Sequence, residues 1–260
     1  MTLLPLVAEV CDIAKKAGEK ILEIYEASAD IKIEKKADNS PLTIADKAAN
    51  DIICEGLNKL DVQYPIISEE NKLVDYHTRK NYQYAWMVDP LDGTKEFIKR
   101  NGEFTVNIAL IHENRSVAGV VYVPVTGEML YAARNEGAYH EEAGHKNKLA
   151  CSHFSMQNKG LRVVSSRSHI NPDTQAFLDN LNAPEIVSKG SSLKFLVLAS
   201  GKADIYPRLA PTMEWDTAAA QIILEEAGGK VWDAGTEKAL HYNKENLLNP
   251  YFIASGILDA

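Results

Sequence analysis

Acidic residues stand at the ends of several apolar segments of the sequence, at Glu69, Asp89 and Asp216, and less clearly at Asp46. A carboxylate that ends a buried strand costs free energy unless a partner balances its charge. Mg²⁺ is such a partner, because it prefers oxygen ligands and completes its octahedron with water and substrate phosphate. Any one of these residues could belong to a surface loop, but their repetition at separate segment ends indicates a divalent-cation site.

The densest of these segments is DPLDGT, residues 89–94. Its two carboxylates are three residues apart across a proline turn and can hold metal ions, and the Leu91 carbonyl can join them. Gly93 allows the backbone to approach a phosphate closely, and Thr94 supplies a hydroxyl. A short helix that begins near Asp92 would add free N–H groups, which favour phosphate. A plain Asp-rich turn is the alternative interpretation.

The 260-residue chain has an ordinary globular composition, with 45% hydrophobic and 25% charged residues. The 28 Lys and Arg against 36 Asp and Glu give a formal net charge of −8, which argues against binding to a nucleic-acid polymer. A small anionic substrate is compatible with this charge, because cations inside a pocket can reverse the local field. No segment approaches the ~18–20 apolar residues of an integral membrane span.

Cysteines and histidines form no metal-binding motif. Cys11, Cys54 and Cys151 are far apart without a CxxC pair, and the first residues lack the basic leader and apolar run of a signal peptide. We therefore expect a cytoplasmic protein, with peripheral association with the inner membrane left open. Six histidines without metal-ligand spacing are expected at the surface: His77, His112, His140, His145, His153 and His241.

Helices come first and strands follow in the N-terminal half. Apolar residues at helical spacing over residues 3–24 predict an amphipathic helix that ends before Ser28. A second helix is expected from Thr43 to about Leu60, with Thr43 and Asp46 as a capping box. Strands are expected at residues 31–36, 64–68, 84–89, 104–112, 116–125, 129–134 and 137–140.

The polar residues 141–159 mark the expected boundary between an N-terminal α+β half, residues 1–145, and a smaller C-terminal α/β half, residues 146–260. Strands and helices alternate in the second half, which is typical of an α/β arrangement. The expected strands are residues 161–165, 185–188, 203–207 and 230–232, and the expected helices are residues 172–181, 192–200 and 216–227.

Three motifs in this order resemble the inositol monophosphatase and fructose-1,6-bisphosphatase superfamily: ISEE at 67–70, DPLDGT at 89–94 and WDTAA at 215–219. The resemblance covers nearly the whole chain, and the combination is far more specific than any single motif. It implies a lithium-sensitive, Mg²⁺-dependent phosphatase with a layered α/β/α/β/α sandwich. The active site would lie at the junction of the two halves.

Longer segments resemble the bacterial 3′(2′),5′-bisphosphate nucleotidases of the CysQ type. They are residues 89–110, KGSSLKF at 189–195 and YPRLAPT at 206–212, where Ala210 replaces a common glycine. The resemblance implies hydrolysis of adenosine 3′,5′-bisphosphate to AMP and phosphate, with a role in sulfur metabolism. An inositol monophosphatase and a non-catalytic nucleotide-binding sensor are the alternatives. The oligomeric state stays open, because the apolar faces could serve a core or a dimer.

The resemblance also implies roles for individual residues. Two or three Mg²⁺ ions would be bound by Glu69, Asp89, the Leu91 carbonyl, Asp92 and Asp216. Glu69 would also be catalytic, together with a pair in which Asp46 accepts the Thr94 hydrogen and Thr94 orients the attacking water. The expected substrate contacts are Glu69, Leu91, Asp92, Gly93, Thr94 and Asp216, with Ser166, His169, Gly190 and Lys194 around the nucleotide. Lys95 and Glu96 fit an exposed helix pair or the pocket mouth equally well.

Overall fold

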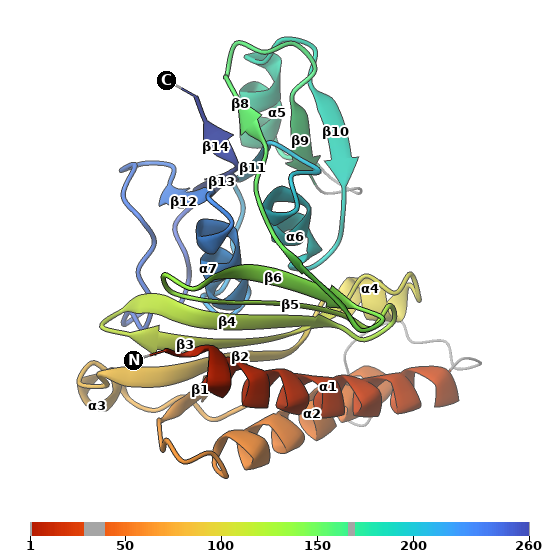
Figure 1. Ribbon diagram of the computed structural model, residues 1–260, viewed down its shortest axis with the longest axis vertical. Coiled ribbons are helices and arrows are strands. Elements are labelled where there is room, and N and C mark those ends of the chain that lie inside the picture. The colour runs from red at the N-terminus through yellow and green to blue at the C-terminus, as the bar shows by residue number, and fades with distance from the viewer. Residues whose placement is uncertain (1, 29–39, 166–169, 260) are drawn as a thin grey trace.

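The computed structural model describes residues 2–28, 40–165 and 170–259, and it has five layers (Figure 1). Helices α1 (Leu4–Ala27) and α2 (Pro41–Leu57) cover one face of a seven-stranded sheet. Helices α6 (Leu193–Ala199) and α7 (Ala218–Glu226) lie between this sheet and a five-stranded one, and α5 (Pro172–Asp179) covers the outer face. This order confirms the expected α/β/α/β/α sandwich.

The seven-stranded sheet follows the chain order from β1 to β7. β1 and β2 are parallel, and every later pair is antiparallel. The strands are β1 (Ile66–Ser68), β2 (Tyr84–Asp92), β3 (Thr105–His112), β4 (Arg115–Val123), β5 (Glu128–Ala133), β6 (Gly137–Glu142) and β7 (His145–Lys148). Six of them match predicted strands and β7 was not predicted, whereas the expected strand at residues 31–36 lies outside the described residues.

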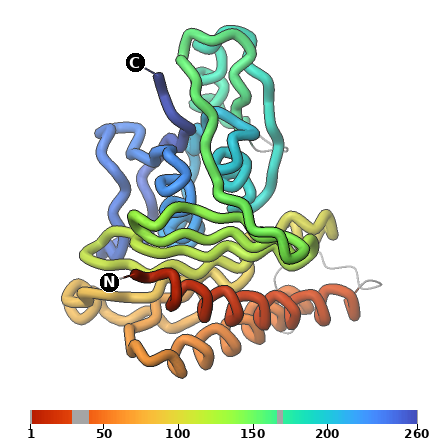
Figure 2. The backbone as a smooth tube through the Cα atoms, in the orientation of Figure 1, coloured from red at the N-terminus to blue at the C-terminus, as the bar shows by residue number. Residues whose placement is uncertain are grey.

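The five-stranded sheet has the order β10-β9-β11-β13-β12, in which β13 is antiparallel to both of its neighbours. Its strands are β9 (Arg162–Ser165), β10 (Glu185–Ser188), β11 (Ile205–Arg208), β12 (Lys230–Asp233) and β13 (Phe252–Ser255). A small pair joins β8 (His153–Phe154) to β14 (Ile257–Leu258), and the short helices are α3 (Tyr76–Arg79) and α4 (Thr94–Ile98). The tube in Figure 2 shows the C-terminal segments returning beside the middle of the chain.

Apolar side chains from facing layers form the cores that hold these layers together. One core lies between α1, α2 and the first sheet, and a larger one joins that sheet to α6, α7 and the second sheet. Gly119 on β4 allows a close approach of two layers, because a β-carbon there would collide with the backbone of Ala219 on α7. Ser116 Oγ also donates to the Ala218 carbonyl at 2.8 Å. Both contacts set the start of α7, two residues after Asp216.

The start of α2 differs from the prediction. Ser40 is the N-cap, and its Oγ accepts a hydrogen bond from the Thr43 amide at 3.2 Å. The predicted capping box of Thr43 and Asp46 is therefore wrong, because Pro41 begins the helix two residues earlier with its backbone already in the helical range. Asp46 is instead buried on the second turn of α2. The helix ends at Leu57, three residues before the predicted end.

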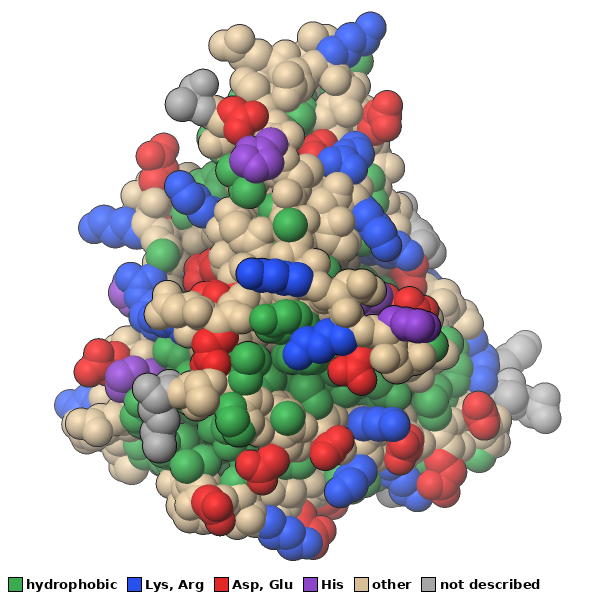
Figure 3. All heavy atoms as spheres, viewed as in Figure 1, with side chains coloured by type: hydrophobic (Ala, Val, Ile, Leu, Met, Phe, Trp, Pro, Cys, Tyr) green, Lys and Arg blue, Asp and Glu red, His purple; other side chains and the backbone are tan. Residues whose placement is uncertain are grey.

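Basic and acidic side chains are interspersed on the face drawn in Figure 3. On this face the basic side chains do not form a continuous stripe of the kind that a nucleic-acid polymer would need. In the part of the chain that the structure describes, none of the helices combines the length and the apolar character needed to cross a membrane.

Candidate active site

The ends of β1 and β2 bring two of the predicted carboxylates together. Ser68 pairs with Val88 in the parallel register, so Glu69, directly after β1, lies beside Asp89, which is within β2. The Glu69 amide also donates to the Val88 carbonyl at 3.2 Å. Asp216 reaches this edge of the sheet from the C-terminal half, just before α7. One carboxylate oxygen from each of Glu69, Asp89 and Asp216 lies within 4.8 Å of the other two.

A β-bulge follows Asp89 and sets the path of the next residues. The register of β2 and β3 shifts between Asp89 and Asp92, and the Leu91 amide donates to Asp89 Oδ1 at 3.1 Å. Gly93 then takes a φ of +105°, and a β-carbon there would lie 3.0 Å from the Glu103 carbonyl oxygen. Only glycine fits both conditions. Helix α4 begins directly afterwards at Thr94, two residues beyond Asp92, near which the sequence left a short helix open.

Asp92 is held from the other half of the chain. Ser191 Oγ donates to Asp92 Oδ2 at 2.6 Å, Ser192 Oγ lies 2.8 Å from the same oxygen, and Asn107 Nδ2 lies 3.4 Å from it. No donor from the described residues reaches Oδ1, which leaves one oxygen for a cation. Neither Ser191 nor Ser192 was predicted to have a role, although both belong to the KGSSLKF segment.

Three of the clustered carboxylates, Asp89, Asp92 and Asp216, carry negative charge that the described residues do not balance by an ion pair. Burial, and then the charges of Asp92, Glu69, Asp216 and Asp46, raise the pKa of Asp89 well above its ordinary value. Burial and Asp92 raise the pKa of Asp216 to about 7. Among the described residues, no Lys or Arg forms an ion pair with Asp89, Asp92 or Asp216. An all-oxygen donor set with unbalanced negative charge fits a hard divalent cation such as Mg²⁺.

These carboxylates line a cavity of about 330 Å³ together with cationic side chains. Lys194 and Arg208 both face it, and burial lowers the pKa of Lys194. Lys194 Nζ donates to the Ser191 carbonyl at 3.1 Å, and Arg208 Nε donates to Thr212 Oγ1 at 2.8 Å. Arg208 was not among the predicted site residues. The sequence signal for Arg208 was a cationic residue directly after the predicted apolar strand, within the YPRLAPT segment.

The other predicted residues lie at different places. α2, which carries the buried Asp46, packs against α4, which begins at Thr94. The Gly190 amide donates to Glu103 Oε2 at 2.9 Å, and a β-carbon on Gly190 would lie 2.6 Å from Glu96 Cγ. Gly190 therefore packs closely against Glu96. The predicted contacts Ser166 and His169 lie outside the described residues, while Lys95 and Glu96 line the cavity.

Comparison with known proteins identifies the family. Residues 3–258 match the model of the inositol monophosphatase family. The chain belongs to the inositol monophosphatase family. A relative from Salmonella typhimurium, named 3′(2′),5′-bisphosphate nucleotidase CysQ, is 44% identical over 95% of this chain and 98% of its own length. The protein of the same name from Escherichia coli K12 is 42% identical over 95% of this chain and 98% of its own length.

Solved structures of the inositol monophosphatase family have the same fold. CysQ from Bacteroides thetaiotaomicron is 45% identical, with a TM-score of 0.86 over 96% of each chain. An inositol monophosphatase from Anabaena is 24% identical, with a TM-score of 0.73 over 98% of this chain and 91% of that one, and it supports the fold alone. The predicted resemblance to this family and to the CysQ type is thereby confirmed.

Proposed function

We propose that the chain is a Mg²⁺-dependent 3′(2′),5′-bisphosphate nucleotidase that hydrolyses adenosine 3′,5′-bisphosphate to AMP and phosphate. The observation that carries this proposal is the cavity that the carboxylate cluster shares with Lys194 and Arg208. A nucleotide bisphosphate needs one phosphate beside a metal cluster and cations for the other. The relatives of 42–45% identity bear the name of this type of enzyme, which supports the same substrate and a role in sulfur metabolism.

The negative cluster would hold two or three Mg²⁺ ions through Glu69, Asp89, Asp92, Asp216 and the Leu91 carbonyl. When bound, these ions supply activation of the attacking water and neutralise charge on the leaving ribose oxygen. The carboxylates meet the geometric requirement, because Glu69, Asp89 and Asp216 converge within 4.8 Å. The hydrogen bonds on Asp92 Oδ2 fix that side chain in advance, so binding costs little further ordering.

The chain's own polar groups position the reaction. In the proposed arrangement Asp46 accepts the hydrogen of the Thr94 hydroxyl, and the Thr94 oxygen in turn orients the attacking water. The backbone at Gly93 and Thr94 contacts the phosphate that is cleaved. The transition-state charge is spread over the phosphoryl oxygens, so placement and charge stabilisation account for most of the acceleration.

Lys194 and Arg208 would bind the phosphate that is not cleaved. Both are cations that line the same cavity as the carboxylates, and Arg208 can donate to two phosphate oxygens at once. We also propose that the chain divides into halves at residues 1–145 and 146–260, with the active site at their junction. The first sheet continues through Lys148, so β7 would span this boundary.

Phosphate release from adenosine 3′,5′-bisphosphate and from inositol 1-phosphate, measured side by side, tests the proposal. We expect strong preference for the nucleotide with Mg²⁺, loss of turnover in EDTA and inhibition by Li⁺. The Arg208→Gln variant should raise KM for the nucleotide more than KM for the inositol ester. Lys238→Gln, an exposed cation outside the cavity, serves as the control. Preference for the inositol ester, or nucleotide binding without turnover, would contradict the proposal.

A further inference from the structure

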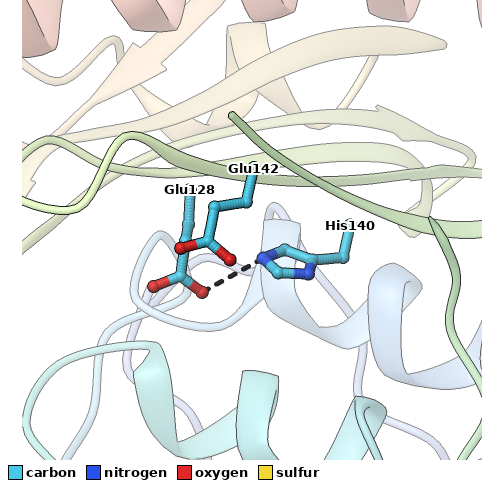
Figure 4. Close-up of side chains that lie close together, drawn as sticks. All are labelled: Glu128, His140 and Glu142. Atoms are coloured by element: carbon cyan, nitrogen blue, oxygen red, sulfur yellow. Dashed lines mark hydrogen bonds and ion pairs between the residues drawn. The ribbon is translucent and has the colours of Figure 1, made fainter. Parts of the chain in front are cut away.

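A second cluster of potential metal ligands lies on β5 and β6, away from the candidate active site. Figure 4 shows the carboxylates of Glu128 and Glu142 and the ring of His140 converging on one another. One ligand atom from each residue lies within 4.8 Å of the other two, and His140 Nε2 is 3.1 Å from Glu128 Oε2. Glu128 and His140 are half-buried, and Glu142 is exposed.

The strand register explains why these three side chains meet. Leu130 pairs with His140 in the antiparallel hairpin, so Glu128 and Glu142 stand opposite each other on the same face. Like charges directly opposite each other destabilise an antiparallel pair. His140 provides one partner, for Glu128, whereas no hydrogen-bond donor among the described residues reaches the Glu142 carboxylate. A cation bound between the two carboxylates would remove this repulsion.

Two further features favour a cation at this place. His145 on β7 is the cross-strand partner of Glu142, so a second imidazole lies next to the cluster. Glu128 and His140 also line a cavity of about 550 Å³ that extends toward α6. This space can hold the water molecules that would complete the coordination of an ion.

We propose that Glu128, His140 and Glu142 form a binding site for a transition-metal dication of the Zn²⁺ class. Imidazole and carboxylate together suit Zn²⁺, whereas the all-oxygen cluster of the active site suits Mg²⁺. Ligand atoms around tetrahedral Zn²⁺ are about 3.3 Å apart for bonds of about 2.0–2.1 Å. His140 and Glu128 already satisfy that spacing, and rotation of the Glu142 side chain brings the third atom to it.

Zn²⁺ binding to the full-length protein, measured by equilibrium dialysis in excess Mg²⁺, tests this site independently of phosphatase activity. Loss of even an outer-shell partner weakens metal binding about 10- to 100-fold, so His140→Ala and Glu128→Gln should each weaken this Zn²⁺ site at least about 100-fold. The Asp216→Asn variant, altered only in the active-site cluster, should keep it. In wild type the side-chain ¹⁵N signal of His140 should shift when one equivalent of Zn²⁺ is added.

His153→Ala is the matched control, because His153 Nδ1 also lies 3.1 Å from a carboxylate, Asp259, but without a second carboxylate in reach among the described residues. It should bind Zn²⁺ as wild type does. Circular dichroism and a cooperative thermal transition verify that each variant is folded. Unchanged Zn²⁺ affinity in folded His140→Ala, or no Zn²⁺ retained by wild type in excess Mg²⁺, would overturn the proposal.

Discussion

Buried carboxylates at the active-site edge and in the second sheet have pKa values shifted in opposite directions. Asp204, just before β11, accepts from the Arg162 amide and from Ser152 Oγ, each at 2.8 Å, and from Arg162 Nε at 3.1 Å. Burial alone would raise the pKa of Asp204, but these hydrogen bonds outweigh burial and hold the pKa below its ordinary value. Asp89 and Asp216 have raised pKa values, and neither forms an ion pair with a Lys or Arg of the described residues.

The charge of Asp204 stabilises the folded state, whereas the charges of the active-site cluster destabilise it. Asp204 has its charge balanced by Arg162 within the chain, so its charged form favours the folded state. At the active-site edge, folding brings like charges together and leaves their balance to an external cation. Sites that bind a ligand in this way commonly reduce the stability of the unliganded protein. Five changes probe this contrast.

Asp92→Asn should have the largest effect. It removes one negative charge from the cluster while preserving the side-chain shape, so turnover of adenosine 3′,5′-bisphosphate should fall at least about 10³-fold. Phosphate release at saturating Mg²⁺ measures it. Asp179→Asn, an exposed carboxylate on α5, is the control and should be neutral. Wild-type activity in Asp92→Asn would remove this residue from the metal site.

Thr94→Ala should lower kcat about 10²-fold and leave nucleotide binding largely intact, because the proposed hydroxyl acts on the attacking water. Thr94→Ser keeps the hydroxyl and should recover most of the rate. Steady-state kinetics and calorimetric binding of the nucleotide separate the two effects. An equal rise in KM with unchanged kcat would place Thr94 in substrate binding alone.

Asp204→Ala should cost about 2 kcal/mol of unfolding free energy at neutral pH, because it leaves Arg162 without its partner. The folded pKa is lowered, so this contribution is present above the unfolded pKa of about 3.9 and is lost as pH falls through the folded value. Denaturant unfolding of wild type and variant from pH 7 to pH 3 should show the two converging in acid. A difference independent of pH would contradict the ion-pair explanation.

Ser192→Ala should lower kcat about tenfold, equivalent to the loss of one hydrogen bond to a charged group. Ser192 Oγ lies between Asp92 Oδ2 and the Asp216 carbonyl, at 2.8 and 3.0 Å. Without it Asp92 should hold Mg²⁺ less well, so the Mg²⁺ concentration for half-maximal activity should rise. Ser200→Ala, at the end of α6 and outside the active-site cavity, is the control. An unchanged Mg²⁺ dependence would show that Ser192 does not position Asp92.

Asp216→Asn should give the smallest change in stability, in the opposite direction to Asp204→Ala. In EDTA it should stabilise the protein by about 1 kcal/mol, because it relieves repulsion in the cluster. Added Mg²⁺ should raise the wild-type melting temperature and have little effect on the variant. Thermal unfolding with and without Mg²⁺ measures both. Destabilisation in EDTA would mean that the Asp216 charge is balanced within the chain.

Local sequence patterns predicted most of the fold. The apolar spacing in α1 and the alternating elements of residues 161–232 were read correctly, because each pattern reflects burial of one face. The later strands β13 and β14 were not predicted. The start of α2 was missed, since Ser40 and Thr43 are both good N-caps and only the path of the chain selects between them. β7 was missed because all four of its residues are exposed, which removes the apolar alternation that predicts a strand.

The sequence by itself determined the family and the strand-end carboxylates, because DPLDGT and ISEE are local motifs whose chemistry is set by neighbouring residues. Tertiary structure decided which distant groups meet them: Asp216 beside Asp89, and Ser191 and Ser192 on Asp92. Tertiary structure also places His140, which was expected only as a surface residue, between two carboxylates. Such contacts depend on strand register and layer packing, and these are properties of the whole chain.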